Sequence, residues 1–147
     1  MADLKRVVYI IDDDPSVLCG FKRLIGAYGY DACLFASAAE FLAAVGVKPR
    51  GGHALIRGLP GPDSCLIIDI AMPEMDGLQL QEELARKSCQ APMIFITALD
   101  DPDIQERVMR AGAAAFFQKP VDATALLDAV KRAMTTETRN AECGTRK

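Results

Sequence analysis

The chain has 147 residues, half of them apolar and a quarter charged, with a formal net charge of −3 from 17 basic and 20 acidic side chains. This composition is ordinary for one globular domain, and it lacks the basic stripe of a domain that grips nucleic acid by itself. No apolar stretch approaches the roughly 18 residues of a membrane span, and no signal peptide is visible, so we expect a cytoplasmic protein.

The first third of the chain alternates between strand and helix patterns. Short apolar runs rich in Val and Ile predict buried strands, and apolar residues at helical spacing predict helices. Ser37 and Glu40 form a capping box, with Ser37 as the cap and Glu40 reaching back. In chain order we expect a strand over about Arg6–Ile11, a helix from Pro15 to the Gly26–Gly29 region, a strand over about Asp31–Phe35, and a helix from Ser37 to near Gly46.

The segment Val47–Asp63 interrupts this alternation. It is rich in Gly and Pro and contains His53, the single histidine of the chain. We interpret it as a loop insertion, with a hairpin and a disordered loop equally compatible with its composition. His53 is expected to be a solvated loop residue, which leaves no histidine for a multi-histidine metal site.

The second half of the chain returns to the same alternation. We expect a strand over Cys65–Asp69, a helix from Asp76–Gly77, a strand over Met93–Thr97, a helix from Asp101–Pro102 to Gly112, a strand over about Ala114–Gln118, and a helix from Asp122 to Met134. Residues 135–147 are polar and aperiodic, which predicts a flexible tail. Five strand–helix pairs predict one domain over residues 1–134, a doubly wound α/β fold with a five-stranded parallel sheet.

Polar side chains stand where four of the predicted strands end. Asp12 and Asp13 follow the first strand, Asp69 ends the third, Thr97 ends the fourth, and Lys119 follows the fifth. In parallel sheets, ligands bind in the crevice beyond the carboxyl ends of the strands. Acids, a hydroxyl and an ammonium at that edge predict a site for a divalent cation and a phosphoryl group.

Each of these residues also has a plainer interpretation when it is considered alone. Asp69 could be a solvated acid at a strand end, and Lys119 a solvated loop lysine. Three carboxylates that meet at neighbouring strand ends repel one another, however, and Mg²⁺ is the hard cation that best fits them and a phosphate. Pro120 makes a cis peptide bond possible, which would aim Lys119 back over the strand edge. Asp14 is expected to cap the first helix.

The cysteines point to no further site. Five cysteines are scattered without paired spacing. Reduced thiols in a cytosolic protein are therefore favoured over disulfides or a zinc centre.

Taken together, these residues resemble the receiver domain of two-component response regulators. The resemblance covers about Lys5–Met134 and rests on four motifs in order at strand ends. They are Asp12-Asp13, Asp69 followed by Met72-Pro73-Glu74-Met75-Asp76-Gly77, Thr97-Ala98, and Lys119-Pro120. The local wording is similar to receivers that carry helix-turn-helix transcriptional output domains.

The resemblance implies a flavodoxin-like (βα)5 fold with strand order 2-1-3-4-5. It also implies a switch that a sensor histidine kinase or a phosphotransfer protein phosphorylates on Asp69 with Mg²⁺ as cofactor. In the implied metal site, Asp13, Asp69 and the Ala71 carbonyl bind the ion directly, and Asp12 binds it directly or through water. Thr97, Lys119 and the Ala98 backbone would bind the phosphoryl group. Phe116 would be the aromatic switch residue.

The output surface is expected on the fourth helix, the fifth strand and the fifth helix, around Phe116. Phosphorylation-dependent homodimerisation or docking of a target would follow there, with no membrane contact and no direct contact with nucleic acid. Candidate contacts are Val108, Met109, Lys131 and Arg132. No enzymatic turnover is expected beyond self-phosphorylation and a slow self-dephosphorylation, because Ala71 and Leu99 are apolar where attacking water would be oriented.

Three alternatives remain open from the sequence. A phosphorylation-independent adaptor would keep the fold and not the switch, although the complete set of site residues argues against it. A phosphohydrolase of the haloacid dehalogenase type would need an acid where Ala71 stands, which makes it improbable. The chain could also be either a stand-alone receiver or part of a longer transcription factor.

Overall fold

In the computed structural model, residues 6–45 and 60–146 are described, and the predicted fold is confirmed. One parallel sheet has the strand order β2-β1-β3-β4-β5. Its strands are β1 (Val7–Ile11), β2 (Asp31–Phe35), β3 (Cys65–Asp69), β4 (Met93–Thr97) and β5 (Ala115–Gln118). β3 is buried along its whole length, which agrees with its unbroken apolar run.

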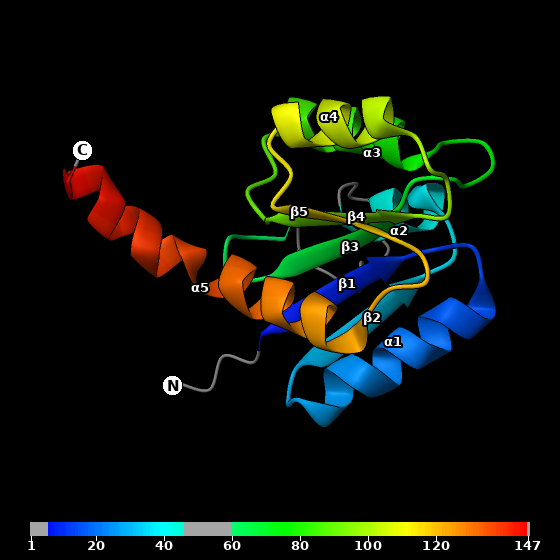
Figure 1. Ribbon diagram of the computed structural model, residues 1–147, viewed down its shortest axis with the longest axis horizontal. Helices are drawn as coiled ribbons and strands as arrows, with labels where there is room; N and C mark the ends of the chain where they lie inside the picture. The colour runs from blue at the N-terminus through cyan, green and yellow to red at the C-terminus, as the bar shows by residue number, and fades with distance from the viewer. Residues whose placement is uncertain (1–5, 46–59, 147) are drawn as a thin grey trace, which may run out of the picture.

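Helices cover both faces of the sheet, so the domain has three layers (Figure 1). The helices are α1 (Pro15–Ala27), α2 (Ala38–Val45), α3 (Gly77–Arg86), α4 (Pro102–Arg110) and α5 (Ala123–Arg146). α1 and α5 lie on one face, and α2, α3 and α4 lie on the other (Figure 1). None of the helices in the described part of the chain is long and apolar enough to cross a membrane.

Each face of the sheet has its own apolar core. Alternate residues of the strands point to opposite faces, so Val8 and Ile10 pack towards α1 and α5, whereas Tyr9 and Ile11 pack towards α2, α3 and α4. Phe41 is fully buried, and its ring lies 5.3 Å from the ring of Phe35. These two packed layers fix the strand ends in space and thereby the residues that follow them.

Helix starts at the carboxyl edge of the sheet are capped by acids. The Asp14 side chain accepts a hydrogen bond from the Ser16 N–H, and Asp101 accepts from the Asp103 N–H. The Asp14 cap agrees with the sequence prediction, and Asp101 caps the helix that was predicted to start at Asp101–Pro102. At α2 the Glu40 N–H donates to Ser37 Oγ, but Glu40 Oε1 accepts from the Ala36 N–H. The Glu40 side chain therefore accepts from the residue before Ser37, where the predicted capping box would have it accept from Ser37 itself.

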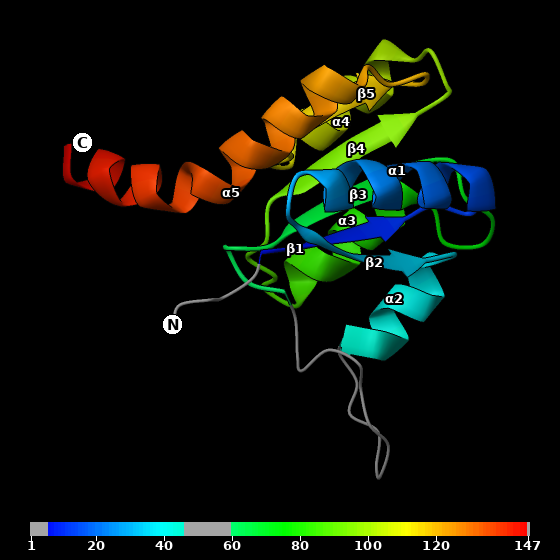
Figure 2. The same ribbon diagram turned by 90° about the horizontal axis from the view of Figure 1, so that it is seen from below.

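The C-terminal helix is longer than predicted, and most of the predicted insertion lies outside the described residues. α5 continues to Arg146, where the sequence suggested a polar tail after Met134, and its last turns extend past the sheet (Figure 2). After Val121 the chain has no proline, and its first glycine is Gly144, so there is no early stop signal for this helix. Most of the insertion predicted at 47–63 lies outside the described residues, and only its last residues form a described turn before β3.

Candidate functional site

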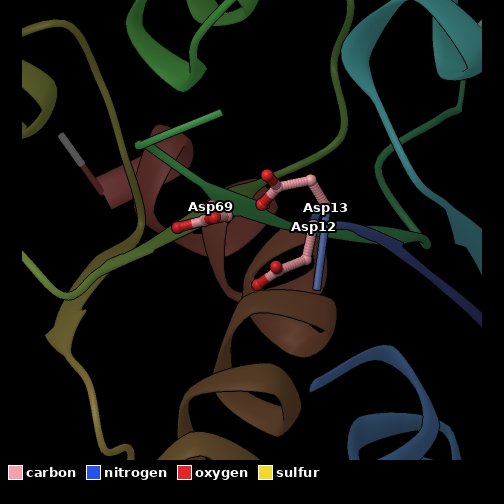
Figure 3. A group of neighbouring side chains, drawn as sticks. All are labelled: Asp12, Asp13 and Asp69. Carbon is pink, nitrogen blue, oxygen red and sulfur yellow. The ribbon is translucent and has the colours of Figure 1, made fainter. Parts of the chain in front are cut away.

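Three carboxylates gather at the carboxyl ends of β1 and β3. Asp12 and Asp13 directly follow β1, and Asp69 is the last residue of β3. Because β1 and β3 are paired in the sheet, these acids lie on adjacent strands, and one oxygen of each lies within 4.8 Å of the others. Figure 3 shows the three side chains around one common space. The structure thus brings together the acids that the sequence placed at this edge.

Lys119 completes this group from the end of β5. Its Nζ donates a hydrogen bond to Asp12 Oδ2 at 3.0 Å and lies 3.5 Å from Asp69 Oδ1. The Lys119–Pro120 peptide bond is cis. Burial lowers the pKa of the Lys119 ammonium, but the hydrogen bond to Asp12 and the charges of Asp69 and Asp12 outweigh burial and leave this pKa above its ordinary value.

Asp69 is the acid with the least favourable surroundings. The residue is 3% exposed, and its Oδ1 is buried without a hydrogen-bond partner. Burial, together with the charges of Asp12 and Asp13, raises the pKa of Asp69 to about 6, although Lys119 counteracts the rise. The Lys119 ammonium at 3.5 Å therefore compensates the charge of this carboxylate without a hydrogen bond to its buried Oδ1.

Asp12 is better satisfied than Asp69. It is fully buried, its Oδ1 accepts the Asp14 N–H at 2.9 Å, and its Oδ2 accepts from Lys119. Asp13, by contrast, is exposed. Since one ammonium cannot neutralise three carboxylates, the group retains a local excess of negative charge that a hard divalent cation would compensate.

Thr97 lies at the end of β4 with its side chain fully buried. Its Oγ1 accepts a hydrogen bond from the Leu99 N–H at 3.0 Å. The hydroxyl proton is not used in that bond and can be donated to another oxygen. The Thr97 carbonyl also accepts the Lys119 N–H at 2.8 Å, which ties the ends of β4 and β5 together.

A close backbone approach holds the end of β3 in place. The Gly77 N–H donates to the Ile70 carbonyl at 2.9 Å, and a Cβ on Gly77 would lie only 2.8 Å from the Asp69 carbonyl oxygen and from Ile70 Cα. Asp76, just before it, caps α3 together with Gln79 in a capping box. The sequence indicated a helix start here, but it did not reveal that Gly77 supports Asp69. The Asp-Gly pair at the helix start was the available signal.

The remaining predicted residues lie around this group. Ala71 and Ala98 are exposed, and Phe116 is half-buried on β5. Leu99 is 46% exposed and Met109 is 41% exposed. Val108 is fully buried in the core on the α4 side, so its predicted role as a surface contact is wrong. Lys131 and Arg132 are exposed, as an output surface would require.

Comparison with known proteins agrees with this arrangement. A family model described as "Response regulator receiver domain" matches residues 8–131. The response regulator protein TmoT of Ectopseudomonas mendocina is 37% identical over 91% of this chain and 55% of its own length. Nodulation protein W of Bradyrhizobium diazoefficiens is 34% identical over 88% of this chain and 51% of its own length. The chain thus spans about half the length of these curated relatives.

Solved structures show the same fold. The structure of the response regulator StyR has a TM-score of 0.74 and 34% identity, covering 97% of this chain and 67% of that one. The FixJ-N crystal structure has a TM-score of 0.72 and 28% identity, covering 91% and 95% of the two chains. The family match, from residue 8 to residue 131, covers every strand residue except Val7. The chain therefore belongs to the response regulator receiver domain family of two-component systems.

Proposed function

We propose that this receiver accepts a phosphoryl group on Asp69 from a phosphohistidine of a sensor histidine kinase or phosphotransfer protein. The observation that carries the proposal is the buried Asp69 carboxylate, whose Oδ1 accepts no hydrogen bond and lies 3.5 Å from the Lys119 ammonium. An Asp69 oxygen attacks the phosphorus, the bond from phosphorus to the histidine nitrogen breaks, and the imidazole leaves and takes up a proton. The product is an acyl phosphate.

The donor set fits Mg²⁺. Asp12, Asp13 and Asp69 offer three carboxylate oxygens within 4.8 Å of one another, and hard oxygen ligands are those that Mg²⁺ prefers. Asp13 would bind the ion directly, Asp12 directly or through water, and the Ala71 carbonyl would complete the protein ligands. When bound, the ion would neutralise charge on the phosphoryl oxygens. The orphaned Oδ1 of Asp69 is the atom that most needs such compensation.

Lys119, Thr97 and Ala98 would bind the transferred group. The Lys119 ammonium is already placed 3.5 Å from Asp69, so it can pair with a phosphoryl oxygen without a large movement. The Thr97 hydroxyl has a proton to donate, and the Ala98 backbone N–H would add a second donor. This contribution is positioning and electrostatic stabilisation more than covalent chemistry.

An apolar groove beside the site supports a protein as the phosphodonor. The groove has a volume of about 370 Å³ and is lined by α1 residues, among them Val17, Gly20 and Phe21, and by Lys119 and Pro120. A Cβ on Gly20 would contact nothing within 4 Å, so this glycine leaves space for a side chain of the donor protein. Apolar surface that adjoins a charged site suits a docking partner better than a small anion.

The output would follow from a shift of Thr97 towards the new phosphate, which opens space for Phe116. Phe116 is half-buried beside the core on the α4 side, so a change of its rotamer would alter the surface of α4, β5 and α5. Homodimerisation through this surface and regulation of transcription remain part of the proposal. A cytoplasmic location remains a prediction from the sequence.

Acetyl phosphate with Mg²⁺ tests the proposed function directly. We expect one added phosphoryl group by intact mass spectrometry, stable in acid and labile in alkali, and none in Asp69→Asn. Asp100→Asn, which changes an exposed acid near the same edge, is the matched control and should be labelled normally. Normal labelling of Asp69→Asn would place the nucleophile elsewhere and refute the proposal. Labelling by acetyl phosphate also separates this function from a phosphorylation-independent adaptor.

A further inference from the structure

α4 is attached to the rest of the domain by little apolar burial. Of its nine residues, Val108 is fully buried, Ile104 is half-buried and the others are exposed. The polar contacts at its two ends therefore weigh heavily in fixing its position.

At the C-terminal end of α4, one carbonyl accepts two hydrogen bonds. The Val108 oxygen accepts the Ala113 N–H at 3.0 Å, and the Gly112 N–H donates to the Met109 oxygen, also at 3.0 Å. Gly112 has a φ of 108°, so the helix ends in a Schellman-type turn. The second donor to the Val108 oxygen is Nε2 of Gln81 on α3, at 3.2 Å.

Gln81 lies on the buried face of α3 and is 7% exposed. A buried amide is tolerated when it is hydrogen bonded, whereas a leucine or methionine would fill a similar volume without that requirement. What the amide adds at this position is a directional bond to one carbonyl of α4. The bond joins residues of two helices, Gln81 and Val108, that are 27 positions apart in sequence.

The other end of α4 depends on Thr97. The Leu99 N–H donates to Thr97 Oγ1 two residues before the helix cap Asp101. A movement of the Thr97 hydroxyl towards a phosphoryl group would disturb this hydrogen bond and leave the Gln81 contact untouched. The two ends of α4 are therefore held by independent contacts, and only one of them belongs to the candidate site.

We propose that Gln81 is a positioning residue that fixes the C-terminal end of α4 against α3. With that end held, phosphorylation would move the N-terminal end of α4 and the surface around Phe116, and would not displace the whole helix. This inference rests on the proposed function, because Thr97 has to respond to phosphorylation at Asp69.

Gln81→Met tests the hold in the resting state, because it keeps the length of the side chain and removes the donor. We expect backbone amide hydrogen exchange at Ala113, measured by NMR, to become about 5- to 10-fold faster, the effect of losing one hydrogen bond. Arg107→Gln is the matched control, since it breaks an exposed ion pair of 3.8 Å between α4 and Glu82 of α3 and should leave this exchange unchanged. Unchanged exchange in Gln81→Met, or an equal acceleration in Arg107→Gln, would overturn the proposal.

Beryllofluoride with Mg²⁺ tests the role of Gln81 in switching. In the wild-type chain, shift changes should concentrate at Thr97 to Asp101 and at Phe116, and in Gln81→Met they should spread to Met109 to Ala113. Equal changes at both ends of α4 in the wild type would refute the fixed end. If the wild type shows no response at Thr97, the proposed function fails, while the exchange comparison still decides whether Gln81 holds the helix. Should Gln81→Met lose the fold, Gln81→Leu provides the same comparison, because it also lacks the donor and adds no buried charge.

Discussion

Asp69→Asn is expected to make the domain more stable at neutral pH. The folded chain holds Asp69 at a pKa of about 6, against an ordinary value of 3.8, because the carboxylate is buried and lies near Asp12 and Asp13. Folding therefore disfavours the ionised form, and asparagine removes the negative charge while it keeps the shape. Lys119 is expected to keep the hydrogen bond to Asp12 that measures 3.0 Å in the wild-type chain.

The size of the effect follows from the difference between the two pKa values. A pKa raised from 3.8 to about 6 corresponds to roughly 3 kcal/mol of lost stability when the group is ionised in both states. Because the pKa of Asp69 is higher in the folded chain than in the unfolded chain, the folded chain binds the proton more tightly, and ionisation of Asp69 lowers the free energy of unfolding. The penalty is thus full above pH 6, shrinks as the pH falls towards 4, and disappears when both states are protonated.

Urea unfolding followed by circular dichroism in EDTA provides the assay. At pH 7.5 the free energy of unfolding of Asp69→Asn should exceed that of the wild type by up to roughly 3 kcal/mol, and the difference should fall to roughly 0.5 kcal/mol at pH 4. The exposed control Asp100→Asn should stay within about 0.5 kcal/mol of the wild type at both values. A variant that is less stable at pH 7.5, or a gain that does not change with pH, would refute this account of Asp69.

Three further predictions address the surroundings of Asp69. Gly77→Ala should lower the free energy of unfolding by about 1–3 kcal/mol and reduce labelling by acetyl phosphate, because its Cβ would lie 2.8 Å from the Asp69 carbonyl oxygen. Gly20→Ala, where the space is open, should raise the free energy of unfolding by about 0.5–1 kcal/mol. Equal unfolding midpoints of the two variants would contradict both expectations. Asp13→Ala should remove most Mg²⁺ affinity in a fluorescence or calorimetric titration while Lys119→Ala leaves it largely intact, so an equal loss in both would contradict the assigned roles. Leu99→Glu combined with Ala71→Asn should speed loss of the phosphoryl group by about 10²-fold, since polar side chains can orient the attacking water, and an unchanged decay would show that these positions do not control it.

The sequence predicted the sheet well because each strand is a short, continuous apolar run. The bounds of β2, β3 and β4 agree with the prediction, and β1 and β5 differ by one residue at their starts. The end of α5 was less predictable, because a helix without a proline or an early glycine has no local stop signal.

The meeting of Asp12, Asp13, Asp69 and Lys119 at one edge was also predictable, since the carboxyl ends of parallel strands lie at the same edge of a sheet. The pairing of Lys119 with the individual acids was less predictable. Lys119 lies nearer to Asp12 than to Asp69, which depends on side-chain geometry that spacing does not encode. Val108 was expected at the surface, although it follows Ile104 by four residues and so shares the buried face of α4, whereas Met109 lies one position further round the helix.

The unfavourable state of Asp69 links the stability of the domain to its proposed function. Burial and the nearby charges of Asp12 and Asp13 raise the pKa of Asp69, and its Oδ1, which accepts no hydrogen bond, is the atom left available for a cation and a phosphoryl group. A hydrogen-bond donor aimed at this oxygen would stabilise the fold and weaken the nucleophile and the metal site together. Gly77 contributes as well, because the absence of a Cβ lets its backbone pack closely against the end of β3. Binding of Mg²⁺ should therefore stabilise the wild type more than Asp69→Asn, as the ion relieves a repulsion that the variant no longer has.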